Sequence, residues 1–123
     1  MKKKLTTEED YRQRVDRVCM YIREHLDKEI DMRRLAVLSA FSPFHFHRIM
    51  RAYLKEPIGA FIIRTRVETA AKLLRYTDLP VADIAYRVGY DTPSSLTKSF
   101  CKLFGISPKM YRLTKNYQMM TTR

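Results

Sequence analysis

Two stretches of this chain repeat each other at an offset of 49–50 residues, and this repeat limits the possible folds more than any other feature. The pairs Leu35-Ala36 and Ala40-Phe41 correspond to Ile84-Ala85 and Gly89-Tyr90. After a shift of one residue, Pro43, Phe46, Arg48, Met50 and Phe61 correspond to Pro93, Leu96, Lys98, Phe100 and Tyr111. Each copy predicts a short helix, a tight turn at a small residue, and a second helix that begins at Ser-Pro or Thr-Pro.

Apolar residues recur at helical spacing over most of the chain, and strand signals are scarce. Pro and Gly residues, with Ser, Thr and Asp in capping positions, divide this pattern into segments. The predicted helices span residues 11–26, 32–38, 43–54, 57–76, 81–88, 93–104 and 108–113. The sequence therefore predicts an all-α fold of seven helices.

The residue types in each copy fit a helix-turn-helix unit. Ala36 and Ala85 stand where the two helices press together, because a larger side chain would hold them apart. Ala40 and Gly89 occupy the turn, where the chain bends sharply and Gly tolerates a positive φ. The predicted organisation is a first subdomain at residues 8–56, a linker helix at residues 57–76, a second subdomain at residues 77–113 and a tail at residues 114–123.

The second helix of each copy has an outward face without carboxylates. In the first copy this face carries Phe44, His47, Arg48 and Arg51. In the second copy it carries Ser94, Ser95, Lys98 and Lys102. A helix that enters the major groove needs cationic and hydrogen-bonding side chains toward the bases and phosphates. The pattern therefore favours a pair of DNA-recognition helices.

Positive charge is concentrated in the part of the chain that contains the repeats. The formal net charge is +11. Residues 1–34 carry 10 basic and 8 acidic side chains, a net charge of +2, whereas residues 35–123 carry 14 and 5, a net charge of +9. A field of this sign attracts polyanions. Charge alone leaves acidic proteins and anionic lipid open as partners, and the two helix faces favour double-stranded DNA.

At these motifs the sequence resembles the DNA-binding domain of the AraC/XylS family of transcription regulators, over about residues 8–113. The resemblance is carried by Val81-Ala82-Asp83-Ile84-Ala85, Val88-Gly89-Tyr90, Leu96, Lys98, Phe100, Lys102, Gly105, Ser107-Pro108 and Tyr111-Arg112. The linker helix adds Arg66-Val67, Ala70 and Leu73-Leu74.

Four positions depart from the family pattern. Leu96 replaces an aromatic residue, Lys98 replaces Arg, and Pro80 replaces a capping Ser or Thr. Lys is a flexible point charge, so Lys98 is less suited than Arg to bidentate recognition of guanine. Lys55 stands where the family has Gly, which predicts that the first unit closes differently from the second.

The resemblance implies a sequence-specific transcription regulator whose two recognition helices enter successive major-groove segments. The predicted base contacts are Phe44, His47, Arg48, Ser94, Ser95 and Lys98. The predicted phosphate contacts are Ser42, Arg51, Thr92, Thr97, Lys102 and Lys109. The resemblance also implies contact with RNA polymerase. We expect either a stand-alone regulator or a longer chain whose effector domain follows Arg123, because the first predicted helix begins soon after Met1.

Other kinds of site find little support. The carboxylates after residue 34 are scattered, and no Gly-rich phosphate loop or nucleophile–base pair appears, so no catalytic residue is predicted. His45 and His47 are about 200° apart on a helix and cannot hold one metal ion together. We expect no metal and no cofactor. Cys19 and Cys101 form no ligand pattern, and Cys101 is expected to be packed and unreactive.

The sequence also bears on where the protein acts and on the alternatives to a specific regulator. No apolar run has the length of a membrane span, and no signal peptide precedes the first helix, so we expect a cytoplasmic protein without a membrane partner. Two alternatives to a specific regulator stay open. One is a non-specific architectural DNA binder, and the other is a helical protein-interaction module.

Overall fold

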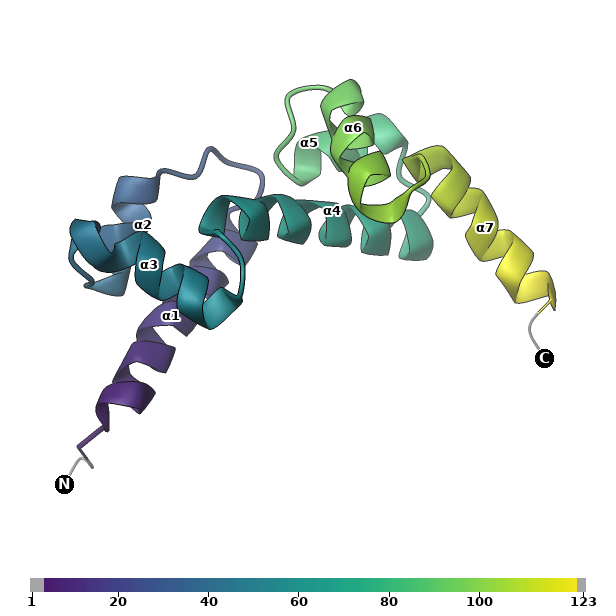
Figure 1. The fold of residues 1–123 in the computed structure, drawn as a ribbon. Coiled ribbons are helices and arrows are strands. Elements are labelled where there is room, and N and C mark those ends of the chain that lie inside the picture. The colour runs from purple at the N-terminus through teal and green to yellow at the C-terminus, as the bar shows by residue number, and fades with distance from the viewer. Residues whose placement is uncertain (1–3, 122–123) are drawn as a thin grey trace. The chain divides into compact units, whose positions relative to one another are not determined.

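The computed structural model describes residues 4–121, and their side chains through residue 114. Seven helices and no strands make up this part of the chain (Figure 1). They are α1 (Thr7–Glu24), α2 (Met32–Ser39), α3 (Pro43–Leu54), α4 (Ile58–Tyr76), α5 (Val81–Arg87), α6 (Pro93–Phe104) and α7 (Pro108–Thr121). The predicted all-α fold of seven helices is confirmed. None of the helices in residues 4–121 is long and apolar enough to cross a membrane.

The helix boundaries differ from the prediction mainly at the first and last helices. α1 starts at Thr7 because Thr6 and Glu9 form a capping box, which the prediction overlooked. The Thr6 hydroxyl accepts the Glu9 N–H at 3.1 Å, and the Glu9 carboxylate accepts the Thr6 N–H at 3.0 Å. Hydrogen bonding to the Thr6 backbone N–H, and then to the Thr6 side chain, holds the pKa of the Glu9 carboxyl below its ordinary value. α7 continues to Thr121 instead of ending at Leu113.

The chain divides after Ile62 into two compact units, and the first unit contains α1, α2, α3 and the start of α4. Its core consists of Val15, Val18, Cys19, Ile22, Leu26, Leu35, Ala36, Phe41, Phe46, Met50, Ile58, Phe61 and Ile62. Ala36 is buried, as predicted for the position where the two helices of the unit meet. The packing leaves one face of α3 free for other contacts.

The second unit contains the rest of α4 with α5, α6 and α7. Its core consists of Val67, Ala70, Ala71, Leu74, Ile84, Ala85, Val88, Leu96 and Phe100. Ala85, the counterpart of Ala36, is fully buried. Each unit therefore supports its own second helix, α3 or α6, with its own core.

Left-handed backbone marks the turns of both units. Ala40 has φ 60° and its counterpart Gly89 has φ 99°, as expected for the bend between the two helices. Lys55 ends α3 with φ 65°, and Gly105 ends α6 with φ 77°. The prediction that Lys55 closes the first unit differently is therefore wrong, because Lys55 adopts the conformation that its Gly counterpart adopts. A non-Gly residue in this region carries a conformational cost.

Polar side chains begin three of the helices as predicted. The Asp31 carboxylate accepts the Arg33 N–H at 2.9 Å at the start of α2. The Ser42 hydroxyl accepts the Phe44 N–H, and the Thr92 hydroxyl accepts the Ser95 N–H, each at 3.1 Å. Pro80 precedes α5 and provides no side-chain cap. These caps fix where α3 and α6 begin, and hence which side chains face outward.

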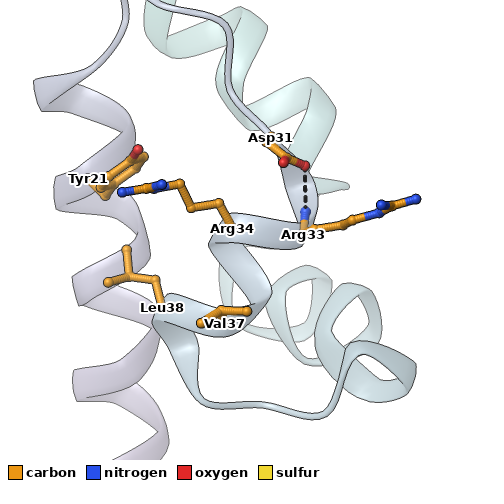
Figure 2. A pocket seen from close by; sticks show the side chains of 6 residues that line it. All are labelled: Tyr21, Asp31, Arg33, Arg34, Val37 and Leu38. Atoms are coloured by element: carbon orange, nitrogen blue, oxygen red, sulfur yellow. Dashed lines mark hydrogen bonds between the residues drawn. The ribbon is translucent and has the colours of Figure 1, made fainter.

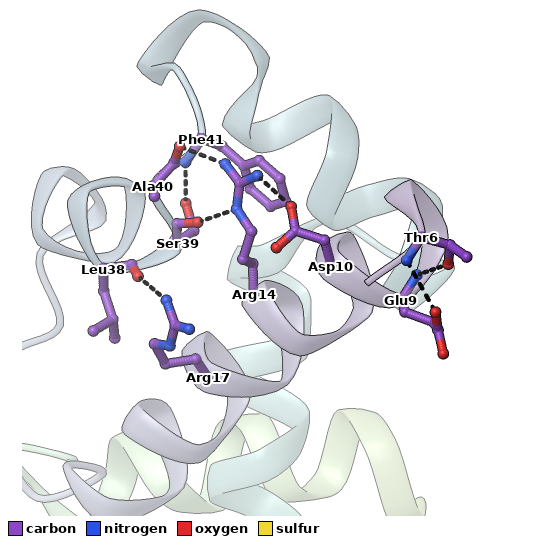
Figure 3. Close-up of polar contacts among 9 residues, drawn as sticks. All are labelled: Thr6, Glu9, Asp10, Arg14, Arg17, Leu38, Ser39, Ala40 and Phe41. Carbon is purple, nitrogen blue, oxygen red and sulfur yellow. Dashed lines mark hydrogen bonds and ion pairs between the residues drawn. The ribbon is translucent and has the colours of Figure 1, made fainter. Parts of the chain in front are cut away.

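Arginines from distant parts of the chain bind the carbonyl groups at helix ends. The Arg14 Nε–H donates to the Ser39 carbonyl at 2.7 Å, and its Nη2–H donates to the Ala40 carbonyl (Figure 3). The Arg14 guanidinium also pairs with Asp10 at 3.1 Å. In the second unit, Arg112 donates to the carbonyls at the end of α4, to Leu74 at 3.1 Å and to Thr77 at 3.2 Å.

Candidate nucleic-acid interface

The outward face of α3 centres on Arg48. At 100° per residue, Phe46 and Met50 lie symmetrically on the opposite side of the helix, and both are buried. Phe44, one turn before Arg48, is 90% exposed. Arg51, one turn after it, is also exposed. The predicted face is therefore present on the surface of the first unit.

The outward face of α6 centres on Lys98 by the same geometry. Leu96 and Phe100 lie opposite it and are fully buried. Four neighbouring side chains, Ser94, Ser95, Cys101 and Lys102, are exposed around Lys98. Both α3 and α6 have 12 residues and start with Pro, so Arg48 and Lys98 hold equivalent places in the two units.

Two exposed residues on these faces were absent from the predicted contacts. His45 lies one turn before Arg48, where Ser95 stands in α6, and the repeat itself is the signal that could have found it. Cys101 occupies the place of Arg51 and is exposed, so the expectation that it is packed was wrong. Its position on α6, 100° from buried Phe100 and next to Lys98 on the wheel, turns it outward.

Two predicted contact residues lie at the borders of these faces. His47 is exposed, but it stands 100° away from Arg48 and lines a shallow hollow with Arg51, Pro57 and Ile58. Its counterpart Thr97 is only half-exposed. These positions suit contacts with the edge of a groove more than contacts with its floor.

The remaining predicted phosphate contacts lie near helix starts. Ser42 and Thr92 cap α3 and α6 through their hydroxyl oxygens and are exposed. Lys109 is exposed in the first turn of α7. The first backbone N–H groups of a helix and its dipole favour a nearby anion. These residues are thus placed beside groups that attract phosphate.

The cations of the two faces are not neutralised by any side chain that the structure describes. Neither α3 nor α6 contains a carboxylate. Within residues 4–114, the side chains of Arg48, Arg51, Lys98 and Lys102 form no ion pair. Within the same residues, no three His, Cys, Asp or Glu side chains gather in a way that could hold a metal ion. The free charges can therefore act on an anionic partner.

Comparison with known proteins agrees with this arrangement. A family model described as a helix-turn-helix domain matches residues 35–114. The HTH-type transcriptional activator AarP of Providencia stuartii is 33% identical over 81% of this chain and 74% of its own length. The F1 operon positive regulatory protein of Yersinia pestis is 35% identical over 80% of this chain. The chain spans only 33% of that protein and about a third of several other relatives.

A solved structure of a related domain has the same fold. The DNA-binding domain of the global transcriptional factor AdpA, in complex with a target DNA, superposes with a TM-score of 0.77 and 28% sequence identity. The match covers 89% of this chain and 96% of that domain. With two helix-turn-helix units, two uncompensated cationic helix faces and these relatives, the chain belongs to the AraC/XylS family of transcription regulators.

Proposed function

We propose that this chain regulates transcription by binding specific duplex DNA sites through α3 and α6, each inserted into the major groove. The observation that carries the proposal is the repeated face: two helices of equal length, each with a central cation opposite two buried apolar residues. A DNA-binding helix needs this combination of support and exposed charge. Binding, without catalysis, is the role that this face can serve.

The relatives support the same role. AdpA was solved with a target DNA on the corresponding domain, and AarP is named as an activator. The resemblance to the family implies one recognition helix in each of two successive groove segments, and we infer this placement for α3 and α6. Activation of transcription in the cytoplasm and contact with RNA polymerase are further parts of this proposal.

Arg48 and Lys98 take different parts in the proposed contact. Arg48 presents a planar guanidinium that can donate two hydrogen bonds to the O6 and N7 of guanine. Lys98 presents a single ammonium, which suits one acceptor or a phosphate. Phe44 lies one turn before Arg48, where its ring can pack on a thymine methyl group. We therefore infer that α3 selects sequence more strongly than α6.

The deciding experiment selects sites from a randomised duplex pool with the whole chain at physiological salt. We expect a motif with two informative blocks about one helical turn apart, and a guanine in one block that depends on Arg48. Arg48→Ala should relax the preference for that guanine and reduce the free energy of binding to the best site by about 1–3 kcal/mol. Arg51→Ala, on the same helix, is the matched control and should weaken all sequences equally.

Other results would point elsewhere. A motif of one block would mean that one of the two units contacts phosphates without reading bases. No enrichment at all, with affinity that collapses as salt rises, would support the architectural alternative and overturn sequence-specific regulation. No DNA binding at physiological salt would support a protein-interaction module.

A further inference from the structure

A shallow groove lies between α1 and α2 in the first unit, and none of the residues assigned to DNA lines it. Its volume is about 540 Å³, and its lining consists of Tyr21, Asp31, Arg33, Arg34, Val37 and Leu38 (Figure 2). α2 buries Leu35, Ala36 and Ser39 in the unit, so its opposite side, with Arg33, Arg34 and Val37, faces outward. No residue of α3 lines the groove.

The groove exposes apolar surface. Val37 is 78% exposed, although it sits in the middle of a helix whose other side is core. Tyr21 of α1 and Leu38 of α2 are half-buried and form the sides of the hollow. A single exposed apolar residue needs no explanation, but several that line one hollow are typical of a binding surface.

Arginines surround this apolar surface. Arg33 and Arg34 are exposed, and the Arg34 guanidinium lies 6.0 Å from the centre of the Tyr21 ring. At the other end of α2, outside the lining of the groove, the Arg17 Nη1–H donates to the Leu38 carbonyl at 3.3 Å (Figure 3). The carboxylate of Asp31 already accepts the Arg33 N–H as the cap of α2. Arg33 and Arg34 have no ion-pair partner within residues 4–114.

The combination identifies the chemistry of the ligand. DNA phosphates would neutralise the arginines but would leave Val37 and Leu38 without apolar contact. An acidic peptide with apolar side chains satisfies both, because carboxylates accept two hydrogen bonds from a guanidinium while the apolar groups cover the floor. We propose that the α1–α2 groove docks a segment of a partner protein in which Asp or Glu residues flank large aliphatic or aromatic residues. The proposal does not depend on how the chain binds DNA.

The test selects random 12-residue peptides displayed on phage against the immobilised whole chain. Enriched peptides should combine carboxylates with Leu, Ile, Met or Phe. The strongest peptide, synthesised with a fluorophore, should bind in an anisotropy titration. Arg34→Glu and Val37→Glu should each weaken it by about tenfold, as expected when a charge-assisted contact or an apolar contact is lost. Lys72→Glu, an exposed charge reversal on α4, is the matched control and should change nothing.

Three results would overturn the proposal. The first is enrichment of peptides without carboxylates. The second is binding that Arg34→Glu and Val37→Glu leave unchanged while both variants keep the thermal unfolding of the parent. The third is a loss of affinity for DNA in Arg33→Ala and Arg34→Ala with a shallower salt dependence, which would make these arginines phosphate contacts. The selected DNA motif is unaffected by the first two results, so the proposed function is tested separately.

Discussion

Phe44 and Phe46 lie two positions apart on α3 and have opposite surroundings. Phe44 is 90% exposed and Phe46 is 1% exposed. Phe44→Ala should change the free energy of unfolding by less than about 0.5 kcal/mol. Phe46→Ala should lower it by about 3–5 kcal/mol, because it leaves a cavity in the core. Urea unfolding followed by circular dichroism measures both values.

The same pair separates folding from binding. Phe44→Ala should reduce affinity for the selected DNA site although the protein stays folded, since the ring is placed to meet thymine methyl groups. A Phe44→Ala variant that binds the site as tightly as the parent would remove Phe44 from the contact surface and leave it as a cap on the turn.

Lys55 and Gly105 end the two recognition helices with nearly the same backbone conformation, φ 65° and φ 77°. Lys55→Gly should raise the free energy of unfolding by about 0.5–1 kcal/mol, because Gly adopts this region at little cost. Gly105→Ala should lower it by a similar amount. A Cβ at Gly105 would meet no atom within 4 Å, so the loss would come from the backbone alone.

Thermal or urea unfolding of both variants checks this pair. A Lys55→Gly variant that is less stable than the parent would contradict the backbone argument and would show that the Lys55 side chain makes a compensating contact.

The residue types predicted the backbone conformation and burial of individual positions only in part. Gly89 and Ala40 were correctly placed in the turns, because small residues between two helical patterns are a local signal. The conformation of Lys55 was missed, since the residue type argues against left-handed backbone and only the fold of the unit imposes it. Cys101 was predicted to be packed and unreactive from the general behaviour of free cysteines, whereas its helix position exposes it.

Arg14 makes several of the contacts between α1 and the end of α2. Arg14 donates to two carbonyls at the end of α2, pairs with Asp10, and lies 4.1 Å from the centre of the Phe41 ring. Arg14→Ala should lower the free energy of unfolding by about 1–3 kcal/mol, because these carbonyls lose a charged partner in a half-buried place. Chemical denaturation of the variant measures the loss.

Arg12 provides the matched control for Arg14. Its pair with Glu8 is 3.7 Å long, and both side chains are mostly exposed. Arg12→Ala should therefore change stability by less than about 0.5 kcal/mol. Equal losses for the two variants would mean that the helical propensity of α1, and not the Arg14 contacts, governs the result.

Local signals explain why the elements were predicted well and their contacts were not. Ser42, Thr92 and the two following prolines set the starts of α3 and α6, and each signal lies within three residues of its effect. Arg14 and Arg112 reach carbonyls 25 and 38 residues away in sequence. No period or cap encodes such a partner, so the groove between α1 and α2 could not be predicted from the sequence.

The Cys101 thiol reports on the exposed face of α6. Cys101 is exposed, whereas burial raises the pKa of the Cys19 thiol above its ordinary value. Cys101 should react with an alkylating reagent at the rate of a free thiol, and Cys19 only on unfolding. The selected duplex should slow the reaction of Cys101, because the residue neighbours Lys98 on the proposed contact face.

A Cys19→Ser variant isolates this signal, since it leaves Cys101 as the single thiol of the chain. Unchanged labelling of Cys101 in the presence of saturating duplex would show that α6 does not enter the groove. A duplex of unrelated sequence serves as the comparison and should protect less at physiological salt.

Charge acts at the scale of the whole molecule. The net charge of +11 attracts any duplex, so affinity alone does not demonstrate specific recognition. The two units have separate cores and carry equivalent faces, each with two uncompensated cations. The whole chain should therefore lose affinity with salt in proportion to the phosphates that both faces contact.

Arg51 and Lys102 allow this proportion to be counted. Each is exposed at the edge of its recognition face, so Arg51→Ala and Lys102→Ala should each make the slope of log K against log salt shallower by about 0.9, the change for one released phosphate contact. In the double variant the slope should change by about twice as much if both faces bind DNA together. Lys72→Ala, on α4, should leave the slope unchanged. If the slope becomes shallower for only one of the two variants, only one unit contacts the DNA phosphates, because the other face then releases no counterions.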